Sequence, residues 1–195
     1  MKKTIKLKHR MMSAVLLGSM LVCGILTGTS TAHAGYFDEL EATKARMHEL
    51  AETARAAGCT EDSRDILDAK KIWHEAQAKI DEQLDMLARV VYFEAGSNWL
   101  SDRHQQLVAC VLLNRCADER FPDTIKENVY RQGQYACANA LYTVSKDQIP
   151  ERCYENARLA AYGMVECNDN VIFQAQFKQG RGTYEKHYNT WFCYG

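Results

Sequence analysis

The sequence predicts a mainly helical α+β fold with a small antiparallel sheet near the C-terminal end. Apolar residues recur at helical spacings through residues 36–57 and again from Asp62 to Glu94. A third helical segment, residues 101–115, is apolar over most of its circumference. Short strand-like runs appear only after residue 170. Long segments of helical periodicity followed by short strand-like runs are typical of this fold class.

The first two helical segments predict an N-terminal helical hairpin. The periodic positions of residues 36–57 are Phe37, Leu40, Met47, Leu50 and Ala54. Gly58 and Cys59 then interrupt the pattern. The second helix has an apolar residue at every seventh position: Ile66, Trp73, Ile80 and Leu87. This repeat favours a coiled-coil-like contact, so we expect residues 35–82 to form a helical spacer that could also mediate self-association.

The second helix leads into a motif that ends in an acidic residue. Leu84, Leu87 and Val91 share one apolar face, and Glu94 is the next position on that face. Gly96 provides a helix stop. Burial disfavours a charged carboxylate, so a carboxyl on this face keeps its proton near neutral pH. A protonated carboxyl beside a cleft is the general acid that glycosidic bond cleavage needs.

The helix that follows, residues 101–115, predicts a buried core element. Ser101 can cap its first turn, and apolar residues occupy most positions from Leu107 to Leu113. Arg103 and Arg115 leave an alternative for Glu94, because a carboxylate at a helix end can pair with either of them or reach water.

The rest of the chain predicts shorter elements. Residues 121–124 form a turn into a short helix that ends near Tyr130, and residues 133–135 form a loop. A helix is expected over residues 153–167, with an inner face made of Ala157, Ala160, Ala161 and Met164. Strands are expected at 171–177 and 190–194, with a turn at 180–182.

The first 34 residues have the pattern of a secretory signal peptide. Five basic residues precede an apolar run from Met11 to Leu26, and the segment ends in small residues before Ala34. Cleavage after Ala34 leaves 161 residues, a secreted protein with no stable membrane insertion. The alternative is an uncleaved anchor, for which the run is short, because a membrane span needs about 20 apolar residues.

Charge and cysteine content limit the partners and the chemistry. Loss of the five basic residues takes the net charge from −1 to −6, which disfavours nucleic acid as a partner. Seven cysteines remain, an odd number, and none forms a Cys-x-x-Cys pair, so we expect no structural metal. We predict a Cys137–Cys153 disulfide, whose 15 intervening residues correspond to about 3 kcal/mol of stabilisation. Cys110 should stay reduced in the core.

Four ordered blocks of the sequence resemble one known family. They are residues 87–95, 106–115, 121–125 and 133–135. Together they are similar to the SleB-type cell wall hydrolases, a family that includes the spore-cortex-lytic enzymes. One departure is at Asn98, because many members have a second Glu at this point of the motif.

The resemblance implies a lysozyme-like, two-lobed catalytic domain over residues 83–195 that acts on peptidoglycan glycan strands without a cofactor. It places the essential acid at Glu94. It also implies a lytic transglycosylase, which cleaves between N-acetylmuramic acid and N-acetylglucosamine and leaves a 1,6-anhydro end. Such an enzyme can work with one carboxylate acting as acid and then base. A hydrolase product, and the choice between vegetative wall and spore cortex, both remain open.

Several other residues are candidates for sugar contact. Tyr92, Phe93 and Trp99 offer stacking faces, and Gln134 and Tyr135 lie on a loop. Asn114 and Arg115 could contact sugar or hold the backbone near Glu94. Gln174 is a candidate for contact with N-acetyl groups.

Three other functions compete with the glycosidase. A cysteine peptidase would use Cys110 or Cys116 with His104 or His187, although a nucleophilic Cys prefers a helix N-terminus or cationic surroundings. A metal amidase would need a ligand cluster, and no His-Glu-x-x-His pattern occurs. The third is an inactive wall-binding or scaffold protein.

Overall fold

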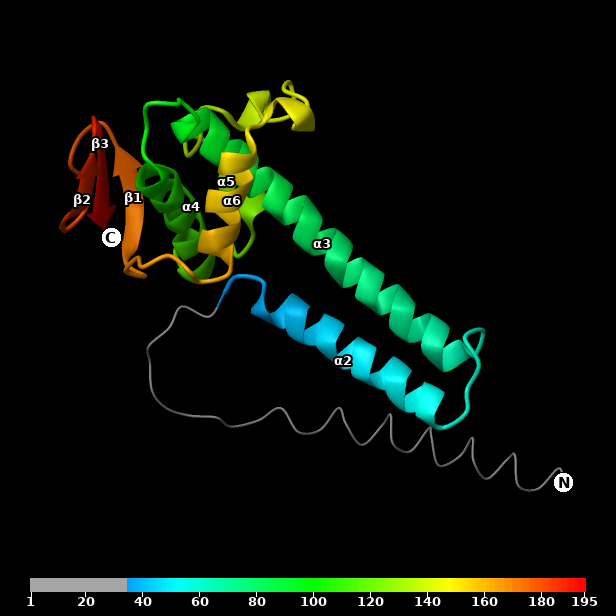
Figure 1. Ribbon diagram of the computed structural model, residues 1–195. Coiled ribbons are helices and arrows are strands. Elements are labelled where there is room, and N and C mark those ends of the chain that lie inside the picture. Colours follow the sequence, from blue (N-terminus) through cyan, green and yellow to red (C-terminus); the bar gives the residue numbers. More distant parts are fainter. Residues whose placement is uncertain (1–34) are drawn as a thin grey trace, which may run out of the picture. The chain divides into compact units, whose positions relative to one another are not determined.

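The computed structural model describes residues 35–195, which lie in one compact unit. The predicted signal peptide therefore lies outside the described residues. The first two helices are α2 (Asp38–Ala56) and α3 (Arg64–Ala95), which run antiparallel as the predicted hairpin (Figure 1). Gly58 permits the reversal because it adopts a φ of 84°, which disfavours other residues. The boundary expected near residue 82 falls inside α3, which continues without a break.

The core forms around α4 (Asp102–Ala117), which lies between α6 (Glu151–Ala161) and the sheet (Figure 1). Val108, Val111 and Leu112 of α4 are almost completely buried. Ser101 caps the helix as predicted, because its hydroxyl accepts a hydrogen bond from the His104 N–H at 3.2 Å. This central helix links the hairpin to the sheet.

Short elements close the unit around α4. Helix α5 (Ile125–Tyr130) begins after Thr124, whose hydroxyl accepts a hydrogen bond from the Glu127 N–H. Two 3₁₀ turns follow, η2 (Ala138–Ala140) and η3 (Lys146–Gln148). Among the described residues, no helix combines the length and hydrophobicity that a membrane span needs.

Helix α6 ends six residues earlier than the sequence predicts. Gly163 takes a φ of 67°, and its N–H and that of Met164 donate back to carbonyls of the last turn. This is a helix stop of the kind glycine favours. Ala157, Ala160 and Ala161 are buried as expected, but Met164 lies beyond the stop and is 72% exposed.

Within residues 35–195 the sheet has three antiparallel strands in the order β1–β3–β2. They are β1 (Val171–Ala175), β2 (Gly182–His187) and β3 (Thr190–Tyr194). The sequence predicts β1 and β3, with β1 two residues too long, but not β2. Strand β2 lies at the edge and carries Glu185 and Lys186, so it lacks the apolar alternation that identifies a strand. The mainly α fold with a small antiparallel sheet is confirmed.

Candidate active site

A cleft of about 380 Å³ opens beside the C-terminal end of α3. Its walls come from the end of α3 and the following loop, from α4, from the end of β1, and from the β2–β3 turn. Of the polar side chains that line it, Glu94 is the only acidic one among the described residues. The polar residues are Glu94, Ser97, His104, Gln174, Gln176, Asn189 and Thr190.

Glu94 stands in the last turn of α3, at the edge of this cleft. The helix stops at Gly96, whose N–H donates to the Tyr92 carbonyl at 2.8 Å. A Cβ at Gly96 would lie 2.3 Å from that oxygen, so glycine is required for this close stop. Leu84, Leu87 and Val91 are buried as predicted, whereas the side chain of Glu94 is exposed to solvent. Glu94 is thus less buried than its apolar helix face suggests, because the end of the helix borders an open groove.

Solvent access does not leave the Glu94 carboxyl in a water-like environment. Partial burial by surrounding protein atoms raises its pKa, while a hydrogen bond from the Cys137 thiol and the charge of Arg115 act in the opposite direction. Exposure to the cleft keeps this rise smaller than in a sealed site. The result is a carboxyl that holds its proton to higher pH than an ordinary Glu and still meets a ligand in the cleft.

Two aromatic side chains meet across the cleft. Trp99, on the loop after α3, and Tyr188, in the β2–β3 turn, have ring centroids 4.5 Å apart at 67°. Both are more than 60% exposed. Tyr188 has a φ of 53°, a conformation that is uncommon for a large side chain. Such backbone strain often accompanies a functional site, and here it places an exposed ring at the cleft.

His104 also lines the cleft, although the sequence suggests a role for it only in the competing cysteine peptidase and metal amidase. It is 2% exposed. Burial, together with the nearby His187, lowers its pKa to about 4, so the ring is neutral at neutral pH. Neither His104 Nδ1 nor Gln174 Oε1 has a hydrogen-bond partner within residues 35–195. Both residues line the cleft, and each retains one buried polar atom without a hydrogen-bond partner.

The structure brings together only some of the predicted site residues. Glu94, Trp99 and Gln174 line one cleft. Tyr135 lies behind Glu94, 7% exposed, with its ring 5.5 Å from the Arg115 guanidinium carbon. Gln134 is exposed on its loop and does not line the cleft.

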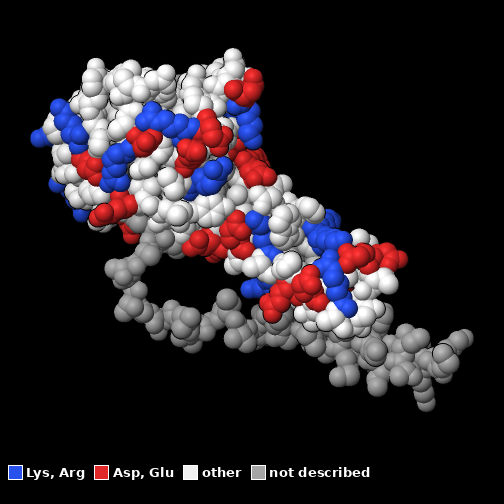
Figure 2. Space-filling model, viewed as in Figure 1, with Lys and Arg blue, Asp and Glu red and all other residues white. Residues whose placement is uncertain are grey.

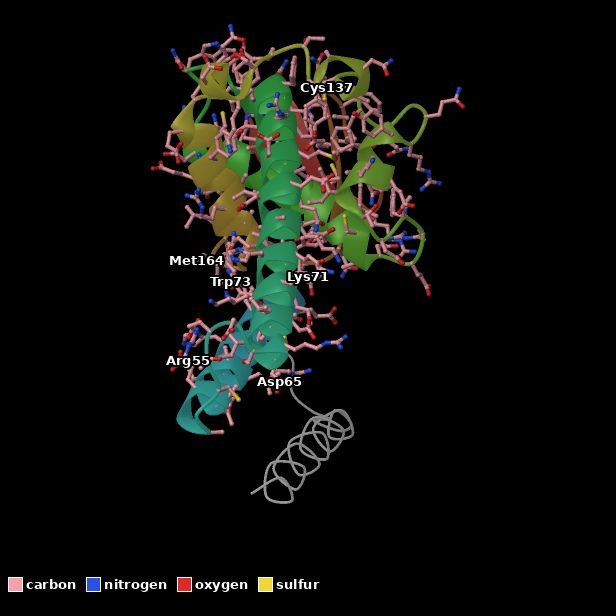
Figure 3. All side chains as sticks on the ribbon, turned by 90° about the vertical axis from the view of Figure 1, so that its right-hand side faces the viewer. Arg55, Asp65, Lys71, Trp73, Cys137 and Met164 are labelled. Atoms are coloured by element: carbon pink, nitrogen blue, oxygen red, sulfur yellow. The ribbon has the colours of Figure 1, made fainter. Side chains whose placement is uncertain are left out.

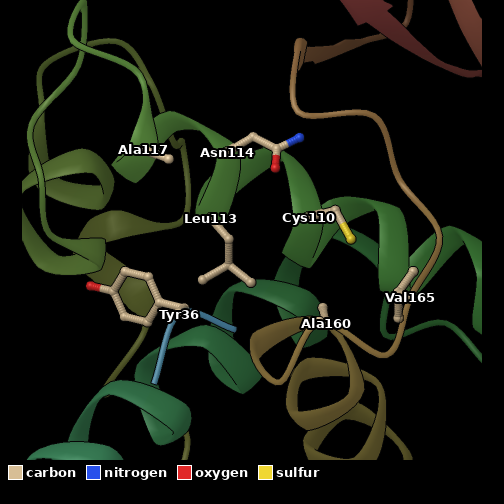
Figure 4. Close-up of a pocket in the computed structure, with 8 residues that line it drawn as sticks. Tyr36, Cys110, Leu113, Asn114, Ala117, Ala160 and Val165 are labelled. Atoms are coloured by element: carbon tan, nitrogen blue, oxygen red, sulfur yellow. The ribbon is translucent and has the colours of Figure 1, made fainter. Parts of the chain in front are cut away.

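Tyr92 and Phe93 do not line the cleft and pack against each other, with centroids 5.3 Å apart. Asn114 has a structural position, because its amide donates to the carbonyls of Asn168 and Val171 at 2.9 and 3.0 Å. It borders a separate cavity of about 110 Å³, shown with Cys110 and Tyr36 in Figure 4.

The predicted Cys137–Cys153 disulfide is not formed, and both residues carry free thiols. Cys153 is buried in the first turn of α6, whereas the Cys137 thiol points to Glu94, with its sulfur 3.4 Å from Oε1. Cys110 is buried as expected, and a hydrogen bond with Cys167 together with burial raises its pKa. Cys110 does not line the cleft that contains His104.

Comparison with known proteins finds that part of this unit is similar to one family. Residues 100–192 match the family model for cell wall hydrolases. This part of the chain is similar to that family. His104, Gln174 and Tyr188 lie inside the matched region, whereas Glu94 lies six residues before it. The match therefore leaves the role of Glu94 untested.

The other comparisons add less. No curated protein matches the chain. Among solved structures, the catalytic domain of the Bacillus cereus SleB protein is similar at 19% identity, with a TM-score of 0.49. The similarity covers 58% of this chain and 90% of that chain. A likeness at this level supports no conclusion about activity.

Proposed function

We propose that this cell wall hydrolase is a secreted lytic transglycosylase that cuts peptidoglycan glycan strands between N-acetylmuramic acid and N-acetylglucosamine. The family supports an action on the wall in general. The observation that carries the finer proposal is the cleft, in which Glu94 is the sole acidic lining residue among those described. Glycosidases that retain or invert by the usual routes need two carboxylates. A transglycosylase can complete its reaction with one.

In the proposed reaction Glu94 acts first as an acid. It gives its proton to the glycosidic oxygen as the bond from that oxygen to the anomeric carbon of muramic acid breaks. The 6-hydroxyl of the same muramic acid attacks the anomeric carbon, and the Glu94 carboxylate accepts the hydroxyl proton. Glu94 is thereby protonated again, no water is consumed, and the product carries a 1,6-anhydro end.

The surroundings of Glu94 suit both halves of this cycle. Partial burial favours the protonated acid at the start, because it raises the pKa. Arg115 and the Cys137 thiol favour the carboxylate that forms next. The Trp99–Tyr188 pair offers apolar faces for pyranose rings, and Gln174 offers a side-chain amide for an N-acetyl group. The cleft therefore contains groups for binding as well as for proton transfer.

The test is digestion of purified peptidoglycan by wild type and by Glu94→Gln, with products identified by mass spectrometry. We expect the variant to lose at least about 10²-fold in rate, the usual contribution of a general acid. Wild type should yield 1,6-anhydro-muramic ends, whereas reducing ends would replace the transglycosylase by a hydrolase. Unchanged lysis by Glu94→Gln would contradict the proposal. Binding of wall without any cleavage by wild type would favour the scaffold alternative.

The structure gives no support to a cysteine peptidase. Burial raises the pKa of Cys116 to about 12 and also raises that of Cys110. Both sulfurs are therefore thiols at neutral pH, and a nucleophile must be a thiolate. Neither residue lines the cleft with His104.

A further inference from the structure

The Cys137 thiol reaches the Glu94 carboxyl from a distant part of the chain. Its sulfur lies 3.4 Å from Oε1 of Glu94, 43 residues away in the sequence. Cys137 directly precedes η2 and is 9% exposed. Figure 3 shows Cys137 at the C-terminal end of α3, whereas Trp73 and Arg55 lie toward the other end of that helix. The contact therefore depends on folding of the loop between α5 and η2 against the end of α3.

Three other polar side chains act on or near Glu94. Arg115 on α4 contributes its positive charge, but its Nε donates to the Ile172 carbonyl at 2.8 Å. Tyr135 lies close enough for its charge state to interact with that of Glu94. His104, neutral at neutral pH, shares the cleft wall. Among the described residues, Cys137 alone donates a hydrogen bond to the Glu94 carboxyl.

We propose that Cys137 is a positioning residue for Glu94, whose S–H group holds the carboxyl in one orientation at the cleft. This inference rests on the proposed acid–base role of Glu94. The thiol has one proton to donate, and its sulfur lies 3.4 Å from Oε1, so Oε2 is left for the substrate. Because the carboxyl is otherwise exposed to solvent, loss of this hydrogen bond would let the carboxyl group of Glu94 rotate.

The surroundings of Cys137 keep it a donor rather than a nucleophile. Burial and the neighbouring Glu94 charge raise the pKa of Cys137 to about 12, so the thiol stays protonated at neutral pH. A hydrogen bond to the charged form of a carboxyl favours that form. Cys137 therefore lowers the pKa of Glu94 relative to a site without the thiol. A thiol-blocking reagent that reaches Cys137 would inhibit lysis although no cysteine takes part in bond cleavage.

The sign of the effect on the pH profile follows from the first step, which needs protonated Glu94. Activity falls as pH rises through the Glu94 pKa. Cys137→Ala removes a donor that favours the carboxylate, so the alkaline limb moves to higher pH. Cys137→Ser supplies a stronger donor, so the limb moves to lower pH. A purely structural role of Cys137 does not predict opposite shifts for these two variants.

The experiment measures kcat and KM against pH on defined glycan strands for wild type, Cys137→Ala, Cys137→Ser and Glu94→Gln. Cys59→Ala is the matched control, because Cys59 is a free thiol in the α2–α3 connection. We expect Cys137→Ala to lower kcat roughly threefold to tenfold, the equivalent of one hydrogen bond, with little change in KM. Cys59→Ala should match wild type.

The outcomes separate this inference from the proposed function. If Glu94→Gln abolishes lysis while both Cys137 variants keep the wild-type limb and kcat, the positioning role is overturned and the glycosidase stands. If Glu94→Gln lyses normally, both fall together. If Cys137→Ala does not fold, Cys137→Ser tests the proposal instead. An alkaline limb of the pH profile that is unshifted in Cys137→Ser also overturns the positioning role of Cys137.

Discussion

The two halves of α3 belong to one continuous helix but differ in what surrounds them. The N-terminal half lies beside α2 (Figure 1) and exposes Leu67 and Ile72 at 51% and 41%. The C-terminal half contains an unbroken buried run from Met86 to Val91 and ends at the cleft. Core stability and the candidate chemistry are therefore concentrated in the same few turns, while the other half extends to the hairpin turn.

The surface charges do not differ between the two parts of the molecule in the way that apolar burial does. Figure 2 shows acidic and basic side chains intermingled on both parts of the visible face. Around the hairpin, Arg55 pairs with Glu52 and Glu61, and Lys71 lies 3.9 Å from Glu75. Exposed pairs of this kind contribute little to stability. The difference between the two halves of α3 therefore lies in apolar burial.

The largest difference between the two halves of α3 is expected when one apolar side chain in each half is truncated. Leu87 is completely buried, so Leu87→Ala should lower the free energy of unfolding by about 2–5 kcal/mol. Ile72→Ala removes a side chain that is 41% exposed and should cost less than about 1 kcal/mol. Urea denaturation followed by circular dichroism measures both. Equal losses would show that the two halves contribute alike to the core.

A smaller effect is expected at the cleft itself. Trp99→Ala removes one ring of the exposed aromatic pair, and we expect KM for glycan strands to rise roughly fivefold while kcat changes little. Stability should be unaffected, since Trp99 is 64% exposed. Tyr130→Ala is the matched control, an exposed aromatic on α5 that does not line the cleft. A fall in kcat with unchanged KM would mean that Trp99 acts on the reaction rather than on binding.

The smallest effect should come from the charged surface of the hairpin. Lys71→Ala removes one partner of an ion pair whose side chains are 74% and 58% exposed. The free energy of unfolding should change by no more than about 0.5 kcal/mol, and lysis should equal that of wild type. Thermal unfolding and a turbidity assay on wall fragments measure the two quantities. A clear loss of lysis with normal stability would give the hairpin a role in wall contact.

Most of the helical structure could be predicted from the sequence, because local rules decide it. The seven-residue repeat that includes Trp73 and Leu87 identifies α3, and Ser101 identifies the start of α4. The local sequence rules failed for elements whose structure depends on neighbouring parts of the fold. Strand β2 forms because β3 offers a partner edge, although its own residues are largely polar. Met164 follows a glycine stop that periodicity alone did not reveal.

The site could be predicted only where its residues lie near Glu94 in the sequence or in a known motif. Trp99 follows Glu94 by five residues and does line the cleft. Cys137 and Tyr188 reach the site through tertiary contacts, and no spacing rule connects them to Glu94. The expected Cys137–Cys153 pair followed from loop length, which carries no information about the direction in which either thiol points.

The residues that line the cleft are far apart in the sequence, so they are also synthesised at different times. Glu94 lies in α3, whereas Gln174 and Tyr188 follow it in the sequence by 80 and 94 residues and leave the ribosome later. A nascent or truncated chain that ends before residue 171 contains Glu94 but lacks the residues of the sheet that line the cleft. On the proposed function, such a fragment should not cleave glycan strands, because Gln174 and Tyr188 are missing from the cleft.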